Sequence, residues 1–112
     1  MTESEFLDLA EQAFNSIENS LEIAAETTDL DVECSRSGNV LEIECIENRS
    51  KIIINTQAPM QEIWVAAKSG GFHYKYDGSI WRNTRDGSEL FAVLSSIVSQ
   101  QAGVTVIVNS AL

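Results

Sequence analysis

The chain contains few of the residues from which catalytic and metal centres are most often built. Its 112 residues include one histidine, one proline and two cysteines. The spacing of Cys34 and Cys45 fits neither a C-x-x-C redox motif nor a zinc knuckle. No G-x-S-x-G, G-x-G-x-x-G, P-loop or EF-hand pattern occurs. These absences argue against nucleophilic catalysis and against a nucleotide or calcium site, and His73 is predicted to be a half-exposed strand residue.

Positive charge is missing from the first third of the chain. The first basic residue is Arg36, and ten acidic residues precede it: Glu3, Glu5, Asp8, Glu11, Glu18, Glu22, Glu26, Asp29, Asp31 and Glu33. Because crowded like charges weaken a folded state, we expect these carboxylates to act on a metal cation, a basic protein surface, or both. The net charge of −10 disfavours nucleic acid and anionic membranes as partners.

Long apolar runs are also missing. The longest, such as residues 52–54, are far shorter than a membrane span, and the polar, acidic start resembles neither a signal peptide nor a transit peptide. We therefore expect a cytoplasmic protein with a single domain, residues 1–112. Its cysteines should be reduced and should serve as small apolar residues in strands.

Residues 3–23 have the period of an amphipathic helix. Apolar residues recur at steps of three and four: Phe6, Leu9, Ala10, Ala13, Phe14, Ile17 and Leu21. Thr2 or Ser4 can cap its start, and the acidic residues point to the opposite side. The later ones lie toward the negative end of the helix dipole, so local helix stability does not explain them.

From Asp29 to Arg82 the period becomes that of short strands. Leu30, Val32 and Cys34 begin the pattern by alternating with polar residues. Further strands are expected at residues 41–45, 51–55, 62–67, 72–76 and 79–83, separated by turns at 37–39, 48–50, 70–71 and 77–78. Short turns between successive strands predict an antiparallel sheet, one face of which can remain wet.

A second helix is expected between Ser88, as its N-cap, and Gly103, which ends it. The β-branched segment 104–108 can form a last strand or fill a groove between the helices. The order helix, strands, helix predicts an α+β two-layer sandwich. Its N- and C-terminal helices pack on one face of a five- to six-stranded antiparallel sheet.

The acidic residues are the best candidate for a functional site. Glu18, Glu22 and Glu26 are spaced to stack on one face of the helix if it runs that far, whereas Asp29 and Asp31 alternate with apolar residues and point away from the core together with Glu33. Carboxylates suit hard cations, and the absence of His and Cys from the group predicts weak, unselective binding. The alternative is a solvated face that only keeps the protein soluble.

A second candidate lies on the wet face of the sheet. If Ile63 and Val65 face the helices, Trp64 faces water, where tryptophan often anchors an interface, and Asn55 and Gln57 can flank it. The alternative on pattern alone is that Trp64 belongs to the core. Trp81 is predicted to be structural.

The stretch 55–66, N-T-Q-A-P-M-Q-E-I-W-V-A, resembles the signature of the frataxin family in its bacterial form. Further similarities are G-G-F-H-Y at 70–74, Trp81, R-D-G at 85–87, the start S-E-F at 4–6 and Q-Q-A-G at 100–103. The resemblance covers nearly the whole chain. It implies the sandwich described above and a role in iron–sulfur cluster assembly, in which family members bind iron weakly and dock on the cysteine desulfurase to modulate sulfur transfer to the scaffold protein.

The resemblance also implies which residues act. The expected ligands of Fe²⁺ or Fe³⁺, for which other divalent or trivalent cations can substitute, are Glu11, Glu18, Glu22, Glu26, Asp29, Asp31 and Glu33. The expected partner-binding residues are Glu18, Glu22, Asp31, Glu33, Glu42 and Glu44 toward the desulfurase, and Asn55, Gln57 and Trp64 toward the scaffold. The implied protein is a cytoplasmic bacterial regulator, monomeric without metal and not an enzyme.

Two departures from the family pattern bear on these roles. Glu62 stands where the family often has glutamine, which adds negative charge beside the tryptophan. Residues 23–28 are less acidic than in many bacterial relatives, which affects a metal site more than a protein interface.

One alternative function is a ferroxidase that stores iron, but no E-x-x-H pair supplies a di-iron site. Oxygen consumption with Fe²⁺ distinguishes a ferroxidase from an iron-binding adaptor. An acidic mimic of nucleic acid would leave the 55–66 stretch unexplained.

Overall fold

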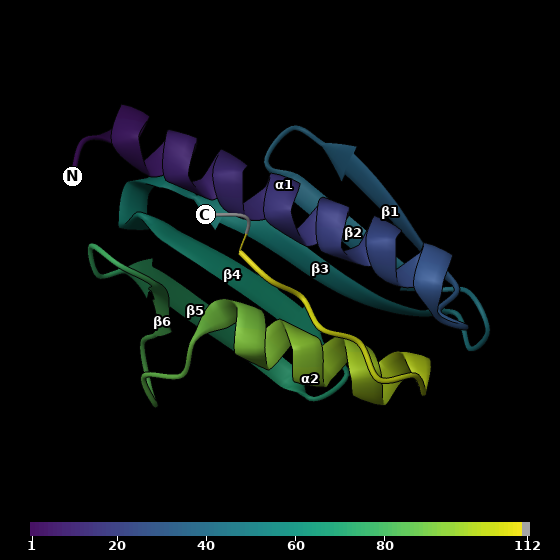
Figure 1. The fold of residues 1–112 in the computed structure, drawn as a ribbon. Coiled ribbons are helices and arrows are strands. Elements are labelled where there is room, and N and C mark those ends of the chain that lie inside the picture. The colour runs from purple at the N-terminus through teal and green to yellow at the C-terminus, as the bar shows by residue number, and fades with distance from the viewer. Residues whose placement is uncertain (111–112) are drawn as a thin grey trace.

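Two helices lie on one face of a six-stranded antiparallel sheet in the computed structural model, which describes residues 1–110 (Figure 1). The elements are α1 (Glu3–Thr27), β1 (Val32–Ser37), β2 (Val40–Cys45), β3 (Ser50–Gln57), the 3-10 helix η1 (Ala58–Met60), β4 (Glu62–Ala67), β5 (Gly70–Tyr76), β6 (Trp81–Asn83) and α2 (Leu90–Ala102). The strands follow one another across the sheet in chain order, each antiparallel to its neighbours. The predicted two-layer α+β sandwich is confirmed, with six strands.

Helix α1 begins with a capping box. The Thr2 side chain accepts a hydrogen bond from the Glu5 backbone N–H at 3.1 Å, and the Glu5 carboxylate accepts one from the Thr2 N–H at 3.0 Å. Two N–H groups that the helix cannot pair internally are thereby satisfied. The helix extends to Thr27, beyond the predicted end at residue 23, so Glu26 is still helical.

The core lies between the helices and the sheet. Both predicted apolar faces are buried, including Phe6, Phe14 and Ile17 of α1 and Leu94 of α2. Facing side chains of the central strands complete it: Leu41, Ile43, Ile52, Ile54, Ile63, Val65 and Tyr74. Because residues alternate between the two faces of a strand, the intervening side chains form an opposite face that neither α1 nor α2 covers (Figure 1).

Several predicted boundaries are wrong. Strand β6 begins at Trp81 rather than at residue 79, and the predicted turn at 70–71 belongs to β5. Strand β1 begins at Val32 rather than near residue 30, and Cys34 is exposed rather than part of the core, because β1 is the edge strand and α1 covers it only partly. The N-cap of α2 is Glu89 rather than Ser88. Its carboxylate accepts hydrogen bonds from the backbone N–H groups of Phe91 and Ala92 at 2.7 and 3.0 Å.

The segment after α2 fills the groove between the helices, the second of the two predicted alternatives. It is not a strand, and it runs between α1 and α2 as the yellow trace in Figure 1. Val106 and Val108 are buried. The hydroxyl of Ser99 accepts a hydrogen bond from the Val106 N–H at 2.9 Å, and that of Ser95 accepts one from Val108 at 2.8 Å, so serine side chains replace the missing strand partner.

None of the helices within residues 1–110 is long and apolar enough to cross a bilayer.

Candidate cation-binding and docking surface

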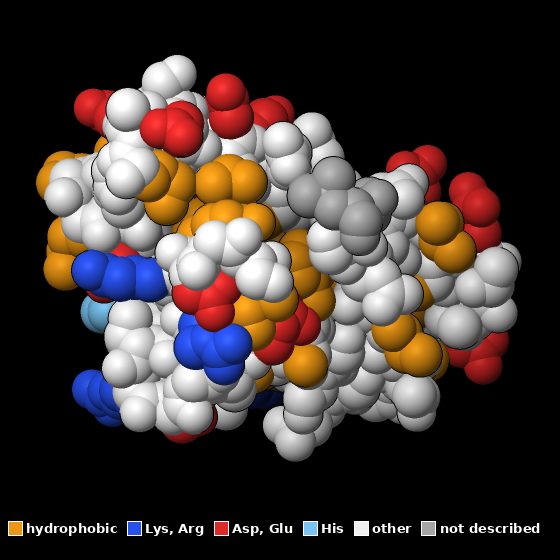
Figure 2. Space-filling model, turned by 60° about the vertical axis from the view of Figure 1, so that its left-hand side comes forward, with side chains coloured by type: hydrophobic (Ala, Val, Ile, Leu, Met, Phe, Trp, Pro, Cys, Tyr) orange, Lys and Arg blue, Asp and Glu red, His pale blue; other side chains and the backbone are white. Residues whose placement is uncertain are grey.

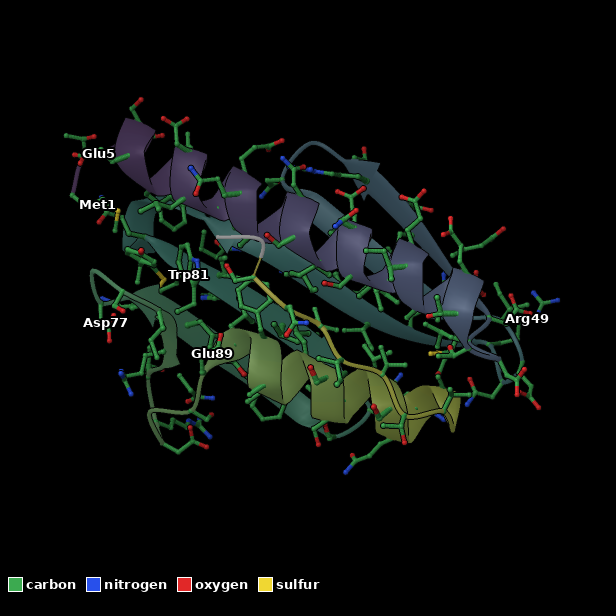
Figure 3. All side chains as sticks on the ribbon, viewed as in Figure 1. Met1, Glu5, Arg49, Asp77, Trp81 and Glu89 are labelled. Carbon is green, nitrogen blue, oxygen red and sulfur yellow. The ribbon has the colours of Figure 1, made fainter. Side chains whose placement is uncertain are left out.

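The predicted acidic residues of α1 lie on its outer side. The helix buries one apolar stripe, which leaves Glu11, Glu22 and Glu26 exposed and Glu18 half-buried at the margin toward β1. Figure 3 shows oxygen-tipped side chains projecting outward along this side of the helix. Since α1 continues through residue 27, Glu18, Glu22 and Glu26 stack at successive turns as predicted.

The acidic side chains continue around the edge of the sheet. Asp29 and Asp31 are exposed in the connection between α1 and β1. Glu33 pairs in register with Glu44 of β2, and Glu44 lies on the face opposite the buried Ile43 and Cys45. Glu33 therefore faces the uncovered side of the sheet, away from α1. We call the set Glu11, Glu18, Glu22, Glu26, Asp29, Asp31 and Glu33 the acidic ridge.

Arg36 interrupts this ridge. It projects from β1 on the side of α1 and forms ion pairs with both Glu11 and Glu18, the latter with a nitrogen–oxygen distance of 3.0 Å. On the uncovered face, Lys51 lies 3.6 Å from the carboxylate of Glu42. These pairs cannot be predicted from the sequence, because nothing in the spacing of an edge-strand arginine shows which helical turn it reaches.

The other five members of the ridge form no ion pair within residues 1–110. We call them the open ridge: Glu22, Glu26, Asp29, Asp31 and Glu33. Two grooves follow it. One, of about 440 Å³, is lined by Glu18, Glu22, Glu26 and Cys34 among others. The second, of about 610 Å³, is lined by Asp29, Asp31 and Glu47 near the C-terminal end of α2.

The described residues 1–110 contain no group of three or more His, Cys, Asp or Glu side chains already placed to hold one metal ion. The ridge therefore offers dispersed carboxylates rather than a preformed coordination sphere. Flexible, hydrated oxygen donors of this kind suit hard cations.

The thiol of Cys34 faces the first of these grooves, next to Glu18. Desolvation by the surrounding side chains, followed by the negative charge of Glu18, raises the pKa of Cys34 from 9.0 to about 11. The thiolate is the reactive form of cysteine, so this thiol is held in its unreactive state.

We expect native Cys34 to be alkylated slowly by iodoacetamide at pH 8. The raised pKa of Cys34 lowers its thiolate fraction at this pH about 100-fold. A more basic thiolate is also more nucleophilic, which recovers about tenfold of that loss. The alkylation rate is therefore about tenfold below that of an unperturbed thiol. Mass spectrometry of the native and guanidinium-denatured chain measures the ratio. Equal rates at Cys34 in the two states would contradict the environment described here.

The second predicted site lies on the uncovered face of the sheet. Ile63 and Val65 are buried, and Trp64 between them faces away from the helices, half-buried. Asn55 is its register partner on β3. The Gln57 amide donates a hydrogen bond to the Asn55 side chain at 2.6 Å, so the three predicted residues are neighbours on one face.

Glu62 holds the tryptophan in place. Its carboxylate is only 7% exposed, and it accepts a hydrogen bond from the Trp64 indole N–H at 2.8 Å. The indole stacks on His73 with ring centroids 4.2 Å apart and planes 5° from parallel. Nδ1 of His73 lies 3.6 Å and Nζ of Lys75 3.9 Å from the same carboxylate. The extra negative charge anticipated beside Trp64 is therefore largely buried.

Most basic side chains lie toward the β6 end of the strand order, away from the ridge. Four of the seven Lys and Arg residues belong to the β4–β5 turn, to β5, or to β6 and the loop after it: Lys68, Lys75, Arg82 and Arg85. His73 is on β5 as well and is half-exposed, as predicted. Four acidic residues, Glu62, Asp77, Asp86 and Glu89, lie in the same segment, residues 62–89, so its charge is balanced, whereas the β1 end is strongly negative.

A hollow of about 520 Å³ opens between the helices at the end where α1 begins. Apolar side chains line much of it, among them Leu9, Tyr76, Phe91 and Ile107. Figure 2 shows orange side chains around this hollow, with acidic side chains along the upper edge over α1. The hollow is separate from the acidic ridge and from Trp64.

The sequence of this chain matches those of known proteins. The sequence model of the frataxin-like domain matches residues 1–104. The chain is 67% identical to the iron–sulfur cluster assembly protein CyaY of Janthinobacterium sp. (strain Marseille), over 99% of each chain. It is 66% identical to the protein of the same name from Herminiimonas arsenicoxydans, with the same coverage.

Solved structures share the fold. A frataxin from Psychromonas ingrahamii has 35% sequence identity and a TM-score of 0.88, covering 97% of this chain and 99% of that one. Trimeric frataxin from the yeast Saccharomyces cerevisiae, complexed with ferrous iron, has 25% identity and a TM-score of 0.71, covering 84% and 85%.

Proposed function

Because this chain belongs to the frataxin family, we propose that it is an iron-binding adaptor that regulates iron–sulfur cluster assembly. The names of its bacterial relatives state that pathway, and the yeast relative binds ferrous iron. The observation that carries the proposal is the open ridge, in which five carboxylates at the surface form no ion pair within residues 1–110.

Iron is cargo or effector in this proposal, and the open ridge holds it weakly. Carboxylate oxygens are ligands for Fe²⁺ and Fe³⁺, and dispersed, hydrated donors cannot select strongly between hard cations. Other divalent or trivalent ions therefore substitute for iron. Loose binding suits a protein that passes iron on, since a closed site would keep it.

The same charges dock the chain on a basic protein surface, which we propose belongs to the cysteine desulfurase. Complementary charge speeds association and fixes orientation. The uncovered sheet face, with Asn55, Gln57 and Trp64, contacts the scaffold protein. The register pair of Glu33 and Glu44 connects the ridge to this face, so the chain, a cytoplasmic monomer without metal, reaches both partners at once. The adaptor itself catalyses no reaction.

Anaerobic titration of the ¹⁵N-labelled chain with Fe²⁺ tests the iron site. We expect paramagnetic broadening centred on residues 22–33, without saturation at one equivalent, because shared carboxylates bind weakly. The double variant Glu22→Gln/Glu26→Gln should reduce broadening along the helix while leaving that near Asp31. Broadening centred instead on His73, or none at millimolar Fe²⁺, would remove the iron-binding part of the proposal.

A further inference from the structure

Helix α1 holds Arg36 at both terminal nitrogens of its guanidinium group and through the ring of Phe14. One terminal nitrogen donates hydrogen bonds to the Asn15 amide oxygen and to Glu18, both at 3.0 Å, and the other contacts the Glu11 carboxylate. The central carbon lies 5.0 Å from the centroid of the Phe14 ring. The side chain is 23% exposed, so this arginine is partly enclosed in a seat built by one side of α1.

The chemistry of this seat matches a guanidinium group closely. Glu11, Asn15 and Glu18 are spaced by four and three residues, so they form one stripe on the helix. Their oxygens meet the planar fork of donors that distinguishes arginine from lysine, and the Phe14 ring adds a cation–π contact. Each hydrogen bond to a carboxylate is charge-assisted and therefore stronger than a neutral one.

We propose that Arg36 determines which part of the acidic ridge is offered to cations and partners: it occupies Glu11 and Glu18 and confines binding to the open ridge. This inference rests on the proposed function, because it concerns the same carboxylates. A cation or a basic side chain that used Glu11 or Glu18 would first have to displace Arg36 and its four contacts. The open ridge requires no such displacement.

The consequence is that chemically identical carboxylates on one helix act differently. In the native chain, Glu18→Gln should change the affinity for the cysteine desulfurase less than twofold, because Arg36 already neutralises Glu18. In the variant Arg36→Met, which keeps an apolar stem near Phe14 but removes the guanidinium, the same substitution should weaken binding threefold or more. This non-additivity measures the competition directly.

Lys68→Met supplies the matched control. It also removes one positive charge and changes the net charge equally, but Lys68 is exposed in the β4–β5 turn, away from the acidic ridge. Arg36→Met should strengthen docking on purified cysteine desulfurase three- to tenfold in 50 mM salt, whereas Lys68→Met should change it less than twofold. Equal effects of the two variants would mean that only total charge matters and would overturn the inference.

A second measurement uses the chain alone. With Mn²⁺ as the paramagnetic probe, we expect broadening in the native chain to be strongest within residues 22–33 and, in Arg36→Met, the strongest broadening to shift toward Asn15 and Glu18. Arg36→Lys should give an intermediate shift, because lysine keeps the charge without the fork, and circular dichroism confirms folding of each variant. If the desulfurase binds no form of the chain, the proposed docking function fails while the Mn²⁺ map still decides the role of Arg36. An unchanged map would overturn it.

Discussion

Replacing Trp81 with alanine is expected to lower the free energy of unfolding by about 3–5 kcal/mol. The side chain is 4% exposed and packs edge-on against two rings, Phe6 of α1 at 5.9 Å and Tyr76 of β5 at 5.3 Å between centroids. Figure 3 shows it between the sheet and the start of α1. Its loss leaves a cavity at the point where three elements meet. Because small domains have only about 5–15 kcal/mol to lose, the variant should be marginally stable.

Trp64→Ala is the matched control, since it deletes the same side chain from the uncovered face of the same sheet. Only the stacking on His73 and the hydrogen bond to Glu62 are lost, and the freed carboxylate regains water. We expect a loss of about 1 kcal/mol. Urea denaturation followed by circular dichroism measures both values, with Trp81→Phe as a milder variant if the alanine form does not fold. Comparable losses at the two positions would place both tryptophans in the core and remove Trp64 from the docking surface.

Reversing Glu22 and Glu26 to lysine is expected to weaken docking on the cysteine desulfurase at least 30-fold. The two carboxylates are exposed, one turn apart, and unpaired within residues 1–110. Each reversal removes one negative charge and adds one positive charge, so the net charge changes from −10 to −6. A lysine opposed to a basic partner replaces attraction with repulsion, which costs several kcal/mol across an interface, and each 1.4 kcal/mol is tenfold in affinity.

Glu3→Lys/Asp8→Lys provides the control on the same helix with the same net charge of −6. These two residues lie on the first turns of α1, outside the acidic ridge, and should change docking less than threefold. The reversals at 22 and 26 put positive charge near the C-terminal end of the helix, where the dipole favours it, so unfolding cannot account for lost docking. Biolayer interferometry gives the affinities, and a similar loss in both double variants would contradict docking through the open ridge.

The fold could be predicted well from the sequence because its signals are local. The heptad-like spacing from Phe6 to Leu21 and the alternation from Leu41 to Cys45 both depend on period alone, and Gly103 ends α2 in the left-handed conformation, with φ of 73°. The errors lie where periodicity gives no information. Strand β1 is an edge strand with one neighbour, so alternation there does not fix where pairing begins.

The candidate site could be predicted only in part, because side-chain pairing depends on register. Alternation left two positions open for Trp64, and the structure confirms the first, in which Trp64 shares the uncovered face with Asn55 and Gln57. Alternation does not show that Arg36 reaches Glu11 and Glu18, which are 25 and 18 residues away. Nor does it show that the Glu62 carboxylate accepts a hydrogen bond from the Trp64 indole. Which carboxylates bind iron or the desulfurase stays a prediction.

The concentration of negative charge at one end of the strand order gives the molecule an electric dipole. Twelve of the 17 acidic residues and only one basic residue lie within residues 1–45, whereas residues 62–89 contain four of each and are balanced in charge. In the field of a positively charged surface, such a molecule rotates before it touches anything. Encounters would then begin with the β1 edge already leading, and the orientation of the sheet relative to the partner would be set by torque at a distance, within about 10 Å at 0.1 M salt.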